Sequence, residues 1–83
     1  MTAKEAWSIV KANLKDVDVE TANELEDIYV FSVRPAGTQP GASTGVTVII
    51  VNKSDGAVDG AFIGDPRLAQ GSYFKVLDPK SFD

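Results

Sequence analysis

Apolar residues recur every three or four positions along the first fourteen residues, with charged and small polar residues between them. This spacing predicts an amphipathic helix whose apolar side packs on a core. Thr2 and Glu5 have the spacing of a capping box, which starts a helix, and residues 13–16 provide a stop. The apolar side of the predicted helix consists of Ala3, Ala6, Trp7, Val10 and Leu14.

In the middle of the chain, the helical spacing of apolar residues gives way to patterns that are typical of β-strands. Residues 28–33 are rich in β-branched and aromatic side chains and predict a strand. Residues 46–51 carry apolar side chains on both faces, which is typical of a central strand. One face of the first strand would consist of Tyr29, Phe31 and Val33, and the other of Ile28, Val30 and Ser32.

A hairpin should follow the second of these strands. Residues 52–56 read NKSDG and predict its turn, and residues 57–63 predict the return strand. We expect Val58 and Phe62 to contribute to the core. Gly60 weakens the strand and is an expected bulge position.

The acid-rich stretch between the predicted helix and the first clear strand is less regular. Val17 and Val19 alternate with acids, which indicates a short strand. Three interpretations stay open for residues 22–27: a turn of helix, a wide bend, or a strand with a bulge.

The C-terminal part predicts two short elements. Asp65 is placed to cap a helical turn that begins at Pro66 and ends near residue 70. Residues 72–77 predict a last strand, with Tyr73 and Phe74 as its anchors. Residues 78–83 predict a loose tail.

These elements predict one α+β domain over residues 1–83, in which the N-terminal helix packs on a small antiparallel sheet of three to five strands. Residues 35–44 read PAGTQPGAST and predict a flexible loop that is long for a hairpin connection. Both a passive surface loop and a functional loop are compatible with that length.

The composition excludes several kinds of chemistry. The chain has no cysteine, so disulfides, thiolate metal sites and a cysteine nucleophile are excluded, and it has no histidine. We therefore expect no enzyme, cofactor or metal site. The net charge is −4 and the basic residues are scattered, which argues against nucleic-acid binding. No apolar run is long enough to cross a membrane and the N-terminus does not read as a secretory signal, so we expect a cytoplasmic protein.

The acidic residues are concentrated in residues 16–27, which contain no lysine or arginine. Three interpretations compete: a solvated connection with no role, a surface that attracts a basic protein partner, or a calcium site. The calcium interpretation is weak because Thr21 stands where an EF-hand loop requires glycine. The candidate partner-binding residues are Asp16, Asp18, Glu20, Glu24, Glu26 and Asp27.

The segment IIVNKSDGAV resembles the strand, turn and return strand of PepSY-like proteins, and it is similar to the YrhB-like immunity proteins of bacterial toxin systems. The resemblance covers about residues 3–64, and the chain differs from the family after Gly64. It implies a cytoplasmic inhibitor that binds a cognate toxin, without assigning any toxin-contacting residue.

Together these observations predict a non-catalytic protein-binding module of the immunity type. The alternative is a small structural or assembly protein, such as a phage or capsid-associated component, that associates through its last strand.

Overall fold

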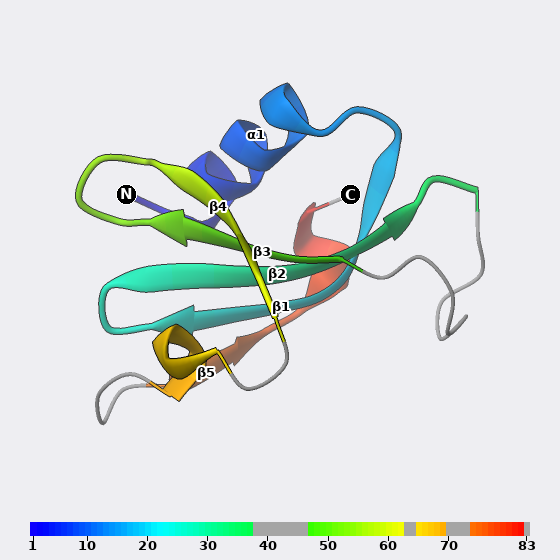
Figure 1. The fold of residues 1–83 in the computed structure, drawn as a ribbon. Coiled ribbons are helices and arrows are strands. Elements are labelled where there is room, and N and C mark those ends of the chain that lie inside the picture. Colours follow the sequence, from blue (N-terminus) through cyan, green and yellow to red (C-terminus); the bar gives the residue numbers. More distant parts are fainter. Residues whose placement is uncertain (38–46, 63–64, 70–73, 83) are drawn as a thin grey trace.

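The computed structural model describes residues 1–37, 47–62, 65–69 and 74–82. Its five strands form one antiparallel sheet in the order β4-β3-β2-β1-β5, and one α-helix lies on the sheet (Figure 1). The predicted α+β fold, with an N-terminal helix and three to five strands, is confirmed. The elements are α1 (Ala3–Asn13), β1 (Val17–Leu25), β2 (Ile28–Pro35), β3 (Thr47–Asn52), β4 (Val58–Ala61), the 3-10 helix η1 (Pro66–Ala69), β5 (Phe74–Leu77) and the 3-10 helix η2 (Pro79–Phe82).

Helix α1 begins with the predicted capping box. The Glu5 amide donates to the Thr2 hydroxyl, and the Thr2 amide donates to the Glu5 carboxylate, both at 3.2 Å. Two of the orphan N–H groups at the helix start are thereby satisfied. The helix buries Ala6, Trp7 and Val10 against the sheet, as its apolar spacing predicts.

A bulge in β1 explains the irregular alternation of apolar and polar residues in the segment 17–27. The pairing of β1 with β2 shifts between Val19 and Thr21, so one extra residue enters β1. Such a residue reverses the alternation of faces. Val19 and Ala22 consequently face the same core although they are three positions apart. Of the three interpretations of residues 22–27, a strand is correct through Leu25, but the bulge lies before this segment, between Val19 and Thr21.

Strands β3 and β4 form the predicted hairpin. Gly56 in its turn has φ of +72°, a region that glycine enters without strain. Two details of the prediction are wrong. The register of β3 with β4 runs without a shift past Gly60, so no bulge occurs there. Phe62 is 62% exposed and does not belong to the core, because it follows the last paired residue of β4.

The two faces of the sheet carry separate clusters of apolar side chains. One cluster contains Trp7, Tyr29 and Phe31 and lies between α1 and the sheet. The other contains Leu25, Ile28, Val30 and Ile50 on the opposite face. In Figure 1, α1 lies on one side of the sheet and η1 on the other. The chain passes from β4 at one edge to β5 at the other, and η1 is part of that connection.

The C-terminal residues replace the expected loose tail with a packed helical turn. The amide of Lys80 donates to the Asp78 side chain and the amide of Ser81 to the Asp78 carbonyl oxygen, which starts η2. Phe82 then packs on the α1 cluster, with its ring centroid 5.6 Å from that of Phe31 in an edge-to-face arrangement. The aromatic contact explains the order, because an apolar ring near the chain end gains by covering the core.

Two further predictions concern the last strand and the loop 35–44. Residues 74–77 form a strand as predicted, but Phe74 is 60% exposed and is no core anchor, while Tyr73 lies outside the described residues. For the predicted loop 35–44, Pro35 ends β2 and a turn follows at residues 36–37. The remainder of that loop lies outside the described residues. Within the described ranges, no helix is long and apolar enough to cross a membrane.

Candidate binding surface

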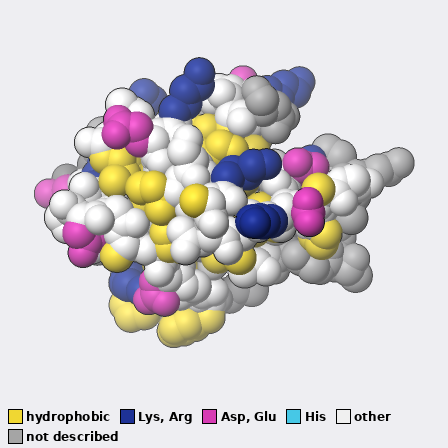
Figure 2. Space-filling view, turned by 90° about the horizontal axis from the view of Figure 1, so that it is seen from above, with side chains coloured by type: hydrophobic (Ala, Val, Ile, Leu, Met, Phe, Trp, Pro, Cys, Tyr) yellow, Lys and Arg dark blue, Asp and Glu magenta, His cyan; other side chains and the backbone are white. Residues whose placement is uncertain are grey.

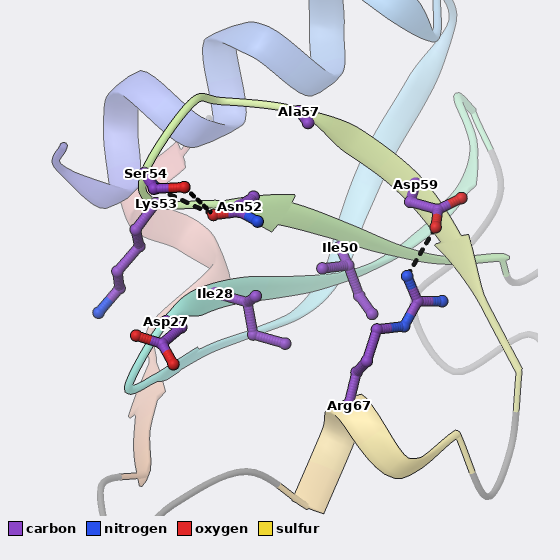
Figure 3. A pocket seen from close by; sticks show the side chains of 9 residues that line it. All are labelled: Asp27, Ile28, Ile50, Asn52, Lys53, Ser54, Ala57, Asp59 and Arg67. Carbon is purple, nitrogen blue, oxygen red and sulfur yellow. Dashed lines mark hydrogen bonds and ion pairs between the residues drawn. The ribbon is translucent and has the colours of Figure 1, made fainter.

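The sheet face opposite α1 carries a hollow of about 610 Å³ beside η1. We call it the Arg67 hollow. The close view in Figure 3 shows its walls coming from the β1–β2 turn, β2, the β3–β4 hairpin and η1. Its lining residues are Asp27, Ile28, Ile50, Asn52, Lys53, Ser54, Ala57, Asp59 and Arg67.

The floor of the Arg67 hollow is apolar and its rim is polar. Ile28 and Ile50 belong to the buried cluster of this face and are only 4% and 3% exposed. Figure 3 shows Asp27 and Asp59 on opposite sides of the hollow, with the two isoleucines between them. A concave apolar floor with a few polar groups around it is the usual composition of a binding site in proteins.

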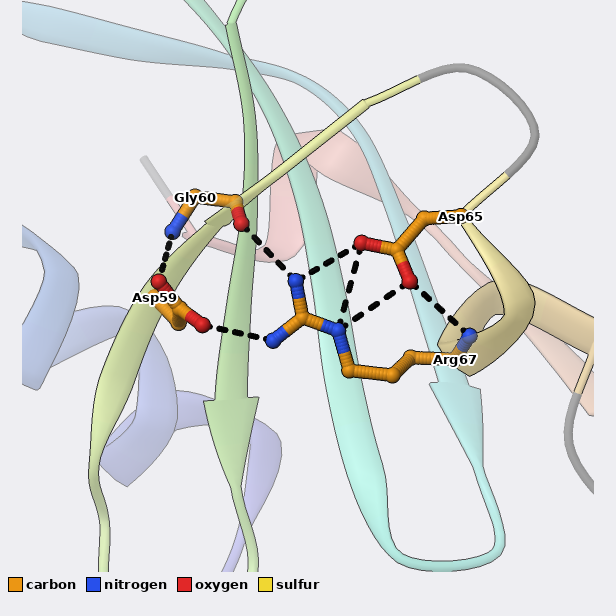
Figure 4. A network of polar contacts seen from close by, with 4 residues as sticks. All are labelled: Asp59, Gly60, Asp65 and Arg67. Carbon is orange, nitrogen blue, oxygen red and sulfur yellow. Dashed lines mark hydrogen bonds and ion pairs between the residues drawn. The ribbon is translucent and has the colours of Figure 1, made fainter.

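Arg67 fixes η1 to strand β4 (Figure 4). Its Nη1 donates to Asp59 Oδ2 at 2.6 Å, and its Nη2 donates to the Gly60 carbonyl oxygen at 3.0 Å. On its other side, the guanidinium donates through Nη2 to Asp65 Oδ2 at 2.7 Å and through Nε to both Asp65 oxygens. Asp65 is only 4% exposed, and this bonding is what makes a buried carboxylate tolerable.

The same contacts set the charge states of Asp59, Asp65 and Arg67. Side-chain hydrogen bonding from Arg67 holds the pKa of the Asp59 and Asp65 carboxyls below the ordinary value of 3.8. Hydrogen bonding to the two carboxylates raises the pKa of Arg67 above its ordinary range. All three groups are therefore charged at neutral pH, and together they carry a net negative charge.

Asp65 also begins η1, as the sequence predicts. Its Oδ1 accepts from the amide of Arg67 at 3.0 Å, and its carbonyl oxygen accepts from the amide of Leu68 at the same distance. Pro66 occupies the first position of the 3-10 helix. The cap and the guanidinium contacts share one carboxylate, so the start of η1 and its attachment to β4 depend on the same residue.

Lys53 also lines the Arg67 hollow, but its ammonium group lies toward the other face of the sheet. Its Nζ lies 2.8 Å from Glu24 Oε2 and 5.0 Å from the centroid of the Tyr29 ring. The Lys53 and Glu24 side chains are 24% and 22% exposed, so water screens this pair only in part. The Lys53 charge is thus directed toward β1 and the α1 side of the sheet.

Asp27 lies at the mouth of the hollow. It occupies the tight turn between β1 and β2, where its carbonyl oxygen accepts from the Lys53 amide at 3.0 Å. Its side chain is exposed. Within the described part of the chain, no hydrogen bond or ion pair engages the Asp27 carboxylate.

A second, smaller hollow of about 210 Å³ lies on the same face, and we call it the Phe74 groove. Beside it, Phe74 and Val76 stand on the same face of β5 and are 60% and 73% exposed. Apolar side chains dominate the groove, with two small polar ones at its edge. Its lining residues are Asn23, Leu25, Val30, Ser32, Val48, Leu68 and Phe74.

The structure does not bring the six acids of residues 16–27 together. Asp16 and Asp18 lie at the start of β1, whereas Glu26 and Asp27 follow its end. A nine-residue strand spans roughly 30 Å at about 3.3 Å per residue, so these two groups are far apart. Figure 2, a view from above, shows the acidic side chains of the visible face spread over it rather than gathered in one patch.

Two of the six acids have basic partners that the sequence pattern did not indicate. Glu20 pairs with Arg34 at 2.9 Å, and Glu24 pairs with Lys53. All four side chains are less than a quarter exposed. Asp16, Glu26 and Asp27 are exposed, and Asp18 is half-buried. Only Asp27 of the six lines the Arg67 hollow. Among the residues with described positions, no cluster of three or more acidic side chains is arranged to hold a metal ion.

The sequence analysis assigned no role to Arg67 or Lys53, the two cations of the hollow. A signal for Arg67 was present in the sequence Asp65-Pro66-Arg67, because a capping aspartate can also accept from an arginine two residues later. Nothing in the sequence could show that Asp59, eight residues from Arg67 and on another element, would complete the network.

Comparison with known proteins identifies no relative of this chain. No protein-family model matches the chain, and no curated protein or solved structure shows significant similarity to it.

Proposed function

We propose that this chain is a non-catalytic protein-binding module that contacts its partner through the sheet face opposite α1. The observation that supports this proposal is the pair of exposed apolar side chains, Phe74 and Val76, beside the Phe74 groove. Exposed apolar side chains gain most when a partner removes them from water, and aromatic residues next to a groove are frequent anchors of interfaces.

The polar groups on this face support binding over catalysis. The chain has no histidine or cysteine to move protons or attack a substrate near neutral pH. Arg67 already holds Asp59 and Asp65, and Lys53 holds Glu24. These cations therefore stabilise the surface rather than remain available for a transition state.

The net charge favours a basic partner, because a charge of −4 accelerates encounter with a protein of opposite charge. Within this function we propose an immunity-type inhibitor of a bacterial toxin, as the resemblance of the IIVNKSDGAV segment implies. The cytoplasm is the compartment that this form of the proposal requires.

Affinity capture from the native host tests the proposal. The bait variant Phe74→Ser/Val76→Ser removes the apolar pair, and Lys75→Ser is its matched control because Lys75 lies between them and faces the other side of β5. We expect the wild-type chain and the control to retain the same protein, and the double variant to lose it. Equal retention by all three baits would contradict the proposed surface.

A second candidate is a structural or assembly protein that associates through β5. This strand lies at the edge of the sheet, and it pairs with β1 through only four residues. Short edge strands with apolar side chains are sites of strand addition. Light scattering over a wide concentration range separates the two functions, since assembly through β5 predicts a mass that rises with concentration and falls in Val76→Pro.

A further inference from the structure

We infer that the Arg67 hollow receives an arginine side chain of the protein partner. This inference rests on the proposed function and names the residue type that the surface recognises. It concerns the Arg67 hollow alone, whereas the apolar contact at Phe74 supports the proposed function by itself.

The shape of the hollow fits a long side chain with an apolar stem. Ile28 and Ile50 form a floor between the carboxylates of Asp27 and Asp59. Arginine side chains commonly lay their methylene groups along such an apolar surface while the guanidinium stays at the polar rim. The volume of about 610 Å³ leaves room for the whole side chain.

The pairing of the charged side chains around the hollow favours a cation. Its two basic residues are already bonded to carboxylates, Lys53 to Glu24 and Arg67 to both Asp59 and Asp65. The charged side chains that line the hollow are Asp27 and Asp59 against Lys53 and Arg67, and of these four only Asp27 has no partner among the described residues. An entering anion would have to displace one of those carboxylates, whereas a cation needs to displace nothing.

Asp27 is the carboxylate that is free to bind the incoming group. It is exposed at the mouth of the hollow, and no described residue donates to its side chain. Asp59, by contrast, already accepts from Arg67 and from the Gly60 amide. A guanidinium donates two parallel hydrogen bonds to one carboxylate, which an ammonium cannot do. Arginine therefore fits this site better than lysine.

Nuclear magnetic resonance with a small probe tests the site in the full chain. The probe is Nα-acetyl-arginine amide, and Nα-acetyl-citrulline amide is its uncharged control. We expect weak binding that shifts the amide signals of residues 27–28, 50, 52–54 and 59, with the citrulline probe giving little effect. Asp27→Asn should weaken binding about two- to fivefold, the range for one partly exposed ion pair.

Asp16→Asn is the matched control variant. It removes the same charge from the same acidic segment, at the other end of β1, and asparagine tolerates the positive φ of 60° at this position. The control should bind the probe as the wild type does.

Three results would overturn the inference. The first is an equal response to the arginine and citrulline probes. The second is equal weakening by Asp27→Asn and Asp16→Asn. The third is a shift of the same residues with protein concentration alone, which would assign the hollow to a second copy of the chain. None of them affects the capture experiment with the Phe74 variants, so the inference and the proposed function fail separately.

Discussion

The sheet face under α1 is closed by aromatic packing, whereas the described residues close the opposite face only in part, with a 3-10 helix of four residues. On the first face, Trp7, Phe31 and Phe82 contact one another, with centroid distances of 5.5 to 6.3 Å. On the second face, Leu68 of η1 packs, together with Val48 and Ala61, on the cluster of Leu25, Ile28, Val30 and Ile50. The two hollows lie on the second face, and each is lined by one residue of η1, Arg67 or Leu68.

The two coverings are also held by different forces. Helix α1 is held by apolar burial, which has no direction and scales with the area removed from water. Element η1 is held by the packing of Leu68 and also by the hydrogen bonds of Arg67 to Asp59, Asp65 and Gly60, which fix one geometry. Within the described ranges, this short element leaves the sheet partly uncovered beside it. We therefore expect stability to depend chiefly on the α1 face, and the proposed binding to use the η1 face.

The largest expected effect tests the stability side of this comparison. Phe31 is fully buried under α1, and Phe31→Ala should lower the free energy of unfolding by about 3–5 kcal/mol. Leu68→Ala on the other face should cost only about 1–2 kcal/mol, because that side chain is half-buried. Urea titrations followed by tryptophan fluorescence measure both. Similar losses for the two variants would show that the faces contribute equally.

The next effect concerns the chain end that belongs to the α1 face. Phe82→Ala should lower the free energy of unfolding by about 2 kcal/mol, less than a fully buried ring because Phe82 is half-buried. Lys80→Ala, an exposed change in the same turn, should stay within about 0.5 kcal/mol of wild type. If both variants were as stable as the wild type, the packing of η2 on the α1 face would contribute nothing to the free energy of unfolding.

A somewhat smaller effect is expected at the polar attachment of η1. Arg67→Met leaves the Asp65 carboxylate buried without its main partner and should cost about 1–2 kcal/mol. The loss should depend on pH. Arg67 lowers the pKa of Asp59 and Asp65, so its contribution is fully present above pH 3.8, the ordinary value, and disappears as the pH falls through the lowered values.

Unfolding of the wild type and Arg67→Met between pH 7 and pH 2 measures this dependence. The gap between the two proteins should be constant from pH 7 to about pH 5 and should narrow below about pH 4. A gap that stays constant to pH 2 would mean that the charge of these carboxylates does not hold η1 in place.

Local patterns predicted the α1 face more fully than the η1 face. The spacing of Trp7 and Val10, the capping box at Thr2 and the alternation in β2 each act within a few residues, and the structure confirms all three. Phe82 was missed because its partners, Trp7 and Phe31, are more than fifty residues away in the sequence. Only the order of the strands brings these residues together.

The candidate site was harder to predict because its contacts join distant elements. The acid-rich segment was visible as a run of charges, but the bulge in β1 and the register with β2 decide which acids find partners. Glu20 meets Arg34, fourteen residues later, and Glu24 meets Lys53. The distribution of charges along the sequence cannot distinguish these two paired acids from Asp27, which stays exposed.

The smallest expected effect asks whether the two faces also differ in their ion pairs. One pair lies on each face: Glu24 with Lys53 next to Tyr29 on the α1 side, and Glu20 with Arg34 at the other end of β1. Arg34 alternates with Val33 and so shares the opposite face with Val30. Their donor–acceptor distances of 2.8 and 2.9 Å and their partial burial are similar.

Glu20→Gln and Glu24→Gln should each lower the free energy of unfolding by about 0.5–1 kcal/mol. Glu26→Gln, which changes an exposed turn residue, should change it by less than about 0.5 kcal/mol. Thermal unfolding at low and high salt measures these losses, and salt should reduce the first two. Equal losses on the two faces would leave apolar packing as the difference between them, whereas a much larger loss for Glu20→Gln would mean that charge stabilises the binding face as well.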